Sequence, residues 1–258
     1  MSNPVTSHFD AERHPCKGLL AGVVVAVLLT LPASWPVRAA SAPDAPAEQA
    51  QVYRIQLGAL AVGATRITWQ PDADGWVSDA LVHIGGMLDQ RQRLYLDASG
   101  LPRRYVLDAT VQGHRTHIDV RREPAAIAET VRVDGRESTT RFASSTPVDW
   151  LDNNSFDTLQ ALLRRNRARL VAGTRIEVFV PQARRFGWLA VDQAKLETTD
   201  GERDKPREIL DLRLRLTVGS DTVPIALAVD PRNATLLEYR QPRRDVEVVL
   251  TRRSGPVP

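Results

Sequence analysis

Residues 210–218 read LDLRLRLTV, a stretch in which apolar and polar side chains alternate without interruption. Successive side chains of a β-strand point to opposite faces of the sheet, so the two kinds of residue separate onto two faces. The apolar face carries Leu210, Leu212, Leu214, Leu216 and Val218, and the polar face carries Asp211, Arg213, Arg215 and Thr217. The stretch therefore predicts a strand with one buried and one solvated face.

The same two-residue period recurs along most of the chain from residue 52 onward. Further strands are predicted at about 100–112, 114–122, 126–133, 136–143, 174–180, 185–197, 223–229, 234–240 and 245–252. Turn sequences such as Ser99-Gly100 and Asp134-Gly135 separate them. The pattern predicts a meander of roughly eleven to fourteen antiparallel strands.

One segment breaks this period and predicts a helix over about 155–169. Its apolar residues Phe156, Leu159 and Leu163 recur at helical spacing. Either Asn154 or Ser155 is suited to cap the amino end, and several arginines follow toward the carboxyl end, where the helix dipole favours cations.

A helix of about 15 residues is roughly 22 Å long and covers only a few strands. The remaining apolar strand faces must pack against one another, so the sheet is expected to curl on itself. The predicted fold class is mainly β: a single long antiparallel meander curled into a half-barrel or barrel-like sheet with one α-helix. The interior is either filled by side chains or open to an apolar ligand. For the open case, the predicted ligand-binding residues of the inner wall are Trp69, Tyr105, Leu212, Leu214 and Leu216.

The amino-terminal region has the features of a secretory signal. The apolar run from Leu19 to Leu31 is shorter than the roughly 20 residues that a membrane-spanning helix needs. Basic residues precede the run, and Pro32 follows it. Small residues at Val37-Arg38-Ala39 offer a cleavage site, and Ala40-Ser41-Ala42 offers a second. A retained anchor over 18–37 is the alternative.

These features predict a signal peptide at 1–39, a flexible leader at 40–51, one β-rich domain at 52–252 and a disordered tail at 253–258. Export by a cleaved signal would place the protein in the periplasm, with no stable transmembrane anchor after cleavage. The single cysteine, Cys16, lies before the apolar run. Cleavage would leave no disulfide, thiolate metal site or cysteine nucleophile, so stability would depend on burial.

The charge distribution argues against nucleic-acid binding. The formal net charge is +3, from 34 Lys and Arg against 31 Asp and Glu. Arginine pairs at 103/104, 121/122, 184/185 and 243/244 are scattered along the chain. A nucleic-acid interface would gather basic residues into a stripe with interleaved aromatic residues, and no such stripe is present in the sequence.

Several short motifs resemble those of an exported, β-rich family of Gram-negative bacteria that is defined as a domain of unknown function. They are Tyr53-x-Ile55-x-Leu57-Gly58 with Val62-Gly63, Ser99-Gly100-Leu101-Pro102, a mid-chain helix after Trp-Leu-Asp, and Val229-Asp230 followed by Leu236-Leu237. The resemblance implies an architecture similar to the half-barrels of periplasmic lipoprotein carriers. It implies no catalytic residues.

Two clusters resemble metal sites, but their spacing is unfavourable. His114 and His117 would lie on opposite faces of a strand, which prevents chelation. Asp152, Asn154 and Asp157 lack the glycine and the final glutamate of a calcium loop. No nucleophile elbow, zinc-protease motif or phosphate loop occurs. We therefore expect no metal, no cofactor, no catalytic residues and no enzymatic activity.

Three functions stay open at this point. The first is a periplasmic carrier for an apolar or lipid-like ligand. The second is a structural or protein-interaction module of the cell envelope that binds an envelope protein through a sheet edge. The third is an enzyme with an unrecognised carboxylate site. An apolar cavity favours the first, a packed interior the second, and acids that converge in a polar cleft the third.

The signal peptide predicts the amino terminus of the mature protein. Mass spectrometry of protein recovered from a periplasmic extract should show a chain that begins at Ala40, or at Pro43 if the second site is cleaved. An intact Met1 in the membrane fraction would contradict cleavage and favour the retained anchor.

Overall fold

The computed structural model describes residues 50–252, apart from residues 145, 153–154, 201–205 and 244–245. The predicted signal peptide, most of the leader and the tail lie outside the described residues. The first strand begins at Ala50, slightly before the predicted start of the domain. None of the helices among the described residues is long and apolar enough to cross a membrane.

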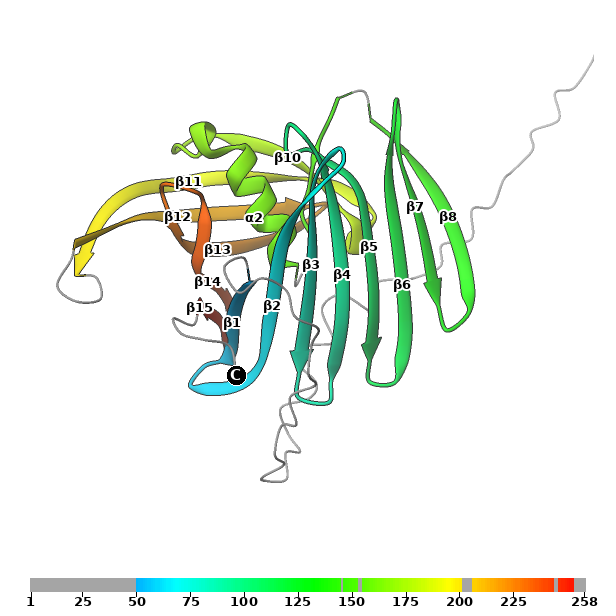
Figure 1. Ribbon diagram of the computed structural model, residues 1–258, viewed down its shortest axis with the longest axis horizontal. Coiled ribbons are helices and arrows are strands. Elements are labelled where there is room, and N and C mark those ends of the chain that lie inside the picture. Colours follow the sequence, from blue (N-terminus) through cyan, green and yellow to red (C-terminus); the bar gives the residue numbers. More distant parts are fainter. Residues whose placement is uncertain (1–49, 145, 153–154, 201–205, 244–245, 253–258) are drawn as a thin grey trace, which may run out of the picture. The chain divides into compact units, whose positions relative to one another are not determined.

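Within the described residues fifteen strands form one sheet, which confirms the predicted mainly β fold (Figure 1). The first half comprises β1 (Ala50–Leu57), β2 (Leu60–Asp72), β3 (Gly75–Ile84), β4 (Leu88–Asp97), β5 (Pro102–Val111), β6 (His114–Glu123), β7 (Ala126–Val133) and β8 (Arg136–Ala143). The second half comprises β9 (Asp149–Trp150), β10 (Arg175–Val180), β11 (Arg185–Asp200), β12 (Pro206–Val218), β13 (Asp221–Asp230), β14 (Thr235–Arg243) and β15 (Val246–Arg252). Each strand from β1 to β7 pairs antiparallel with the next, as the meander predicts.

Two connections go beyond a simple meander. The first and last strands pair with each other, so β1 and β15 lie in the middle of the strand order. Strand β9 pairs with β10 in parallel, whereas the sequence predicted antiparallel pairing throughout. The reason is the helix between them, because parallel neighbours need a crossover connection and a helix commonly provides it.

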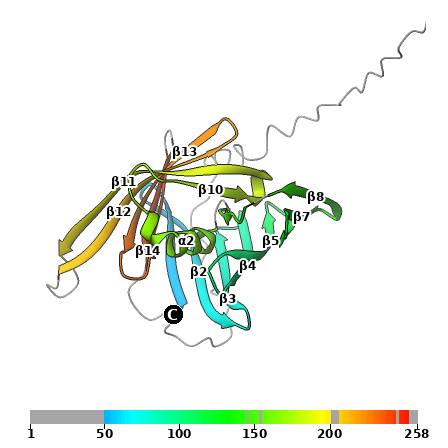
Figure 2. The ribbon, with the colours of Figure 1, turned by 90° about the horizontal axis from the view of Figure 1, so that it is seen from above.

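The strand order forces the sheet to curl. Strand β8 lies at one end of the order and β9 at the other, yet only residues 144–148 join them. Six Cα–Cα steps from Ala143 to Asp149 span at most about 22 Å. The two ends of the sheet must therefore come close together, and the view from above shows the sheet curved around the helix (Figure 2).

Helix α2 (Phe156–Arg165) lies within this curve, and a 3-10 turn over Arg167–Arg169 follows it. A second 3-10 turn, Pro181–Ala183, links β10 to β11. All side chains from Phe156 to Leu163 are buried, so the helix is covered on every side along these two turns. Ser155 occupies the N-cap position without a capping hydrogen bond, and Asn154 lies outside the described residues. The predicted helix is thus present, with its last part in 3-10 form.

Strand β12 confirms the alternation predicted for residues 210–218. Leu212 is fully buried and Leu214 is 2% exposed, while Leu216 packs against the core from its edge. Arg213 and Arg215 are exposed on the reverse face. The core is one continuous cluster that includes residues from strands of both halves and from α2.

The burial of Leu214 predicts the cost of truncating it. Leu214→Ala should lower the free energy of unfolding by about 2–5 kcal/mol, because it removes buried methyl groups and leaves a hole between Val191 and Ile225, its neighbours in the sheet. Arg213→Ala on the outer face is the matched control and should change it by no more than about 0.5 kcal/mol. Urea unfolding measures both. A small loss in Leu214→Ala would mean that this wall borders space rather than packed core.

Candidate functional site

The two ends of the sheet meet along a seam that side chains close. In the described sheet β8 pairs only with β7, and β9 pairs only with β10. Phe142 of β8 packs against Phe179 of β10 with ring centroids 5.0 Å apart, and Phe186 of β11 packs on the other side of Phe179 at 5.4 Å. The seam is therefore closed by aromatic packing instead of a backbone ladder.

A partly buried ion pair crosses the same seam. Arg184, in the turn before β11, reaches β7, where its Nε donates to Oε2 of Glu129 at 2.9 Å. Its Nη2 also donates to Thr140 of β8. Arg184 has a left-handed backbone with φ of 53°, which costs a non-glycine residue about 1 kcal/mol or more. Its contacts across the seam offset that strain.

The Glu129 side chain is fully buried, and its Oε1 has no hydrogen-bond partner among the residues that the structure describes. Burial raises the pKa of this carboxyl from 4.5 to about 7, although the Arg184 guanidinium acts in the opposite direction. Because water is excluded, desolvation of the charged form outweighs its attraction to one partly exposed guanidinium. Glu129 is thus a carboxyl that titrates near neutral pH.

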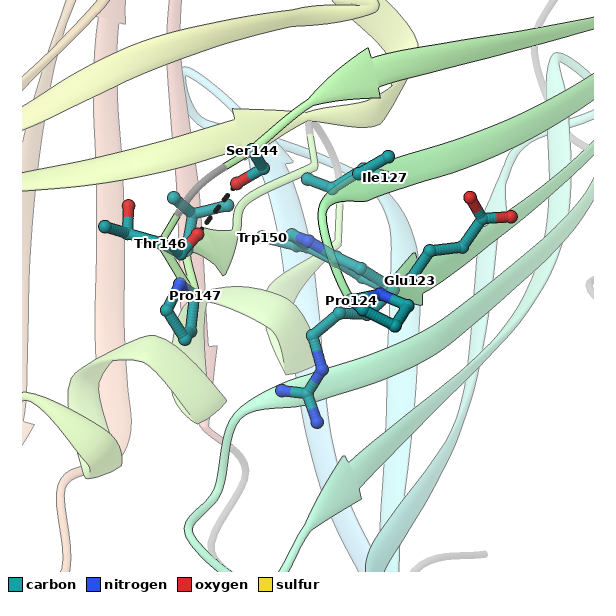
Figure 3. A pocket seen from close by; sticks show the side chains of 10 residues that line it. Glu123, Pro124, Ile127, Ser144, Thr146, Pro147 and Trp150 are labelled. Atoms are coloured by element: carbon teal, nitrogen blue, oxygen red, sulfur yellow. Dashed lines mark hydrogen bonds between the residues drawn. The ribbon is translucent and has the colours of Figure 1, made fainter.

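A pocket of about 370 Å³ opens at the seam (Figure 3). One wall is the β6–β7 turn, and the other is the segment that joins β8 to β9. A hydrogen bond from the Ser144 amide to the Ala125 carbonyl holds these walls together at 3.0 Å. The lining residues are Arg122, Glu123, Pro124, Ala126, Ile127, Ser144, Thr146, Pro147, Val148 and Trp150.

The floor of the pocket is apolar and continuous with the core. Figure 3 shows the indole of Trp150 between Ile127 and Pro124 on one side and Thr146 and Pro147 on the other. Trp150 is 1% exposed, and both Trp150 and Ile127 belong to the core cluster. The pocket is therefore a hollow at the edge of the apolar interior, with its polar atoms near the rim.

The interior itself is occupied by α2, which polar contacts attach to the sheet. Asp157, fully buried, accepts from the Ser78 hydroxyl at 2.5 Å, the Gln92 amide at 2.7 Å and the Ser155 hydroxyl at 2.7 Å. Burial raises the pKa of Asp157, because these donors are neutral and only partly compensate the lost hydration. At the other end of the helix, Arg165 donates to the buried Asp149 at 2.6 Å.

The predicted ligand-binding residues all belong to the core cluster or pack against it. The Trp69 indole donates to Gln160 of the helix at 3.0 Å, and the Arg164 guanidinium lies 4.8 Å from the centre of the Trp69 ring system. The Tyr105 hydroxyl donates to Asp152 at 2.6 Å. The leucines at 212, 214 and 216 belong to the inner face of β12. All five therefore face one interior, but none of them lines the seam pocket.

The histidine and acidic motifs take structural positions. His114 and His117 lie on strand β6, and their Nδ1 atoms are 2.9 Å from Asp134 and 2.7 Å from Asp108, respectively. His83 Nδ1 is 2.6 Å from Asp89. Among the described residues, no group of three or more His, Cys, Asp or Glu side chains is placed to hold a metal ion.

The residues of the seam were not predicted from the sequence. Glu129 lies between Ile127 and Val131 at two-residue spacing, on the strand face that is otherwise apolar. An acidic residue on an apolar strand face was therefore the one feature of the sequence that indicated a buried carboxyl. Gln90 and Gln92 lie on the same face of β4 as Leu94 and Leu96, and these amides on an apolar face are a similar indication of the polar attachment of α2. The partners of these residues come from distant parts of the chain, and strand periodicity does not reveal them.

Comparisons with known proteins give little further information. No family model and no curated protein sequence matches this chain. One solved structure that resembles it is a DUF1089 family protein from Pseudomonas aeruginosa, with 13% identity, a TM-score of 0.33, and coverage of 82% of this chain and 95% of that one. A similarity at this TM-score carries no inference about function.

The raised pKa of Glu129 predicts how stability depends on pH. The protonated form is favoured in the folded state, so the contribution of Glu129 to stability is present below pH 4.5 and lost as pH rises through about 7. The loss corresponds to about 3 kcal/mol, at about 1.4 kcal/mol per pKa unit. Glu129→Gln should remove this dependence, which urea unfolding between pH 4 and 8 measures.

The matched control is Glu137→Gln on the neighbouring strand. Glu137 is about half exposed and pairs with Arg132, so its variant should keep the wild-type pH dependence. Parallel stability profiles for wild type and Glu129→Gln would contradict the assignment.

Proposed function

We propose that this protein is exported to the periplasm and binds an apolar or lipid-like group there without catalysing a reaction. The observation that carries the proposal is the seam pocket, a hollow of about 370 Å³ whose floor is formed by core residues such as Trp150 and Ile127. This volume lies within the ~300–1,000 Å³ range of small-molecule pockets. Export is supported by the amino-terminal charge, apolar run and small residues described above.

The curled sheet offers more apolar surface behind the pocket. Trp69, Tyr105, Leu212, Leu214 and Leu216 form the deeper wall of the proposed site. Helix α2 fills the space next to this wall, so a ligand longer than the pocket requires the helix to shift. Its polar attachments to the sheet are hydrogen bonds of about 0.5–1.5 kcal/mol each in net terms, or about 1.5–3 kcal/mol where a carboxylate accepts, a cost that a buried apolar chain must offset.

The buried acids support a binding role over a catalytic one. Asp157 is enclosed by donors that hold α2, and Asp152 accepts from the buried Tyr105 hydroxyl. Neither aspartate lines the seam pocket. A catalytic acid has to reach a substrate, and these carboxyls face protein groups instead.

One observation favours the alternative of an envelope interaction module. Strand β8 ends the described sheet, and from Arg136 to Thr139 all its side chains are exposed. The backbone edge over these residues, outside the seam contacts of Thr140 and Phe142, could accept a strand from an envelope protein. This role predicts no binding of small apolar molecules.

The carrier proposal predicts bound lipid and a specific point of entry. Native mass spectrometry of the protein from a periplasmic extract should show an added mass that delipidation removes. The delipidated protein should then bind an apolar fluorescent probe saturably. Thr146→Trp, which places a large ring at the exposed rim of the pocket, should weaken this binding by at least about tenfold.

Thr139→Trp is the matched control, because Thr139 is an exposed threonine of β8 that does not line the pocket. It should leave probe affinity unchanged. The carrier proposal would be overturned by an absence of saturable probe binding together with a loss of about 2–5 kcal/mol in the free energy of unfolding of Leu214→Ala. The envelope interaction module would then be the better explanation of the structure.

A further inference from the structure

A second hollow lies on the outer face of the sheet, across β10 to β13. Its volume is about 250 Å³, and its lining residues are Arg175, Trp188, Ala190, Arg215, Thr217 and Thr222. Trp188 is 48% exposed, whereas the next residue, Leu189, is fully buried. Because neighbouring side chains of a strand point to opposite faces, this hollow is on the reverse of the apolar interior.

Trp188 is placed there by the pairing of four strands. It lies opposite Glu177 of β10 and Thr217 of β12, and Thr217 lies opposite Thr222 of β13. The row next to it carries Arg175, Ala190 and Arg215 in register. The small side chain of Ala190 between the two arginines leaves room beside the indole, so the hollow has a flat apolar surface on one side and polar groups around it.

The polar groups around the indole are available for a ligand. Within the described part of the chain, the Arg175 guanidinium makes no hydrogen bond or ion pair, and its side chain is exposed. Arg215 is half exposed and uses one nitrogen on Asp192 at 2.8 Å. The hydroxyls of Thr217 and Thr222 are 3.4 Å apart, and each can donate or accept.

We infer that this hollow binds one pyranose ring of a saccharide. A pyranose has an apolar C–H face that fits an exposed indole and a rim of hydroxyls that exchange hydrogen bonds with guanidinium and threonine groups. The volume is below the ~300–1,000 Å³ of most small-molecule pockets, which suits a single ring. This site is separate from the seam pocket and goes beyond the proposed carrier function.

Other ligand classes fit the hollow less well. An acyl chain would leave the guanidinium and hydroxyl groups without water or partners, which is costly. A single-stranded nucleic acid needs successive aromatic platforms, and Trp188 is the one aromatic residue that lines this hollow. An inorganic anion would use Arg175 but would gain nothing from the indole.

Saturation-transfer NMR of the full-length protein with a panel of methyl pyranosides, neutral and acidic, tests the inference. At least one pyranoside should bind saturably and receive magnetisation mainly through its ring C–H protons. Trp188→Ala should weaken this binding by about tenfold or more, and Arg175→Gln by a smaller factor. Trp76→Ala is the matched control, because Trp76 is 44% exposed on the distant strand β3.

Three results would overturn the inference. They are an absence of binding by every pyranoside, unchanged binding in Trp188→Ala, and full displacement of the sugar by inorganic phosphate, which would indicate an anion site on Arg175. Binding of the same sugar as the head group of a glycolipid in vesicles would also support the ring site. Comparing the affinity for the free pyranoside with that for the glycolipid vesicles shows whether the natural ligand is a free saccharide or a lipid head group. Loss of apolar probe binding at the seam would leave this result unaffected.

Discussion

The short link between β8 and β9 is the constraint on which the rest of the structure depends. These strands occupy opposite ends of the sheet order, and residues 144–148 are all that joins them. A flat sheet of fifteen strands at about 4.8 Å spacing would place its ends much farther apart than such a link can reach. Curvature is therefore a condition of chain connectivity as well as of burial. The curvature also brings the two ends of the sheet together, and with them Phe142 of β8 and Phe179 of β10.

Once the sheet curls, its inner face encloses a helix that needs two kinds of contact. The side of α2 that carries Phe156 packs on Tyr239 with ring centroids 5.3 Å apart, while Asp157 and Gln160 turn to polar side chains of the first strands. Buried polar groups without partners are expensive, so these contacts orient the helix more strictly than apolar packing alone would. The resulting interior is apolar with a polar strip, and the seam pocket borders it at the core residues Trp150 and Ile127.

The two faces of the sheet carry side chains of different kinds, one apolar and one largely polar. Along β11 and β12 the inner side chains are aliphatic, while the outer side carries Trp188 with arginine and threonine. The deeper wall of the proposed apolar site on β12 and the inferred saccharide hollow thus lie on opposite faces of that strand.

The sequence by itself determined most of the strands, the single α-helix and the inward direction of Leu212 and Leu214, because these depend on periodicity within short segments. It gave no bounds for β2, β3, β4 and β9, and it predicted at most fourteen strands where the described sheet has fifteen. It also indicated that so much apolar strand face required a curled sheet. The parallel pairing of β9 with β10, the Glu129–Arg184 pair and the pocket above Trp150 were decided by the tertiary structure alone. Each of these joins residues far apart in the chain or across the seam, and a residue's local pattern carries no information about which distant partner the curvature of the sheet will bring to it.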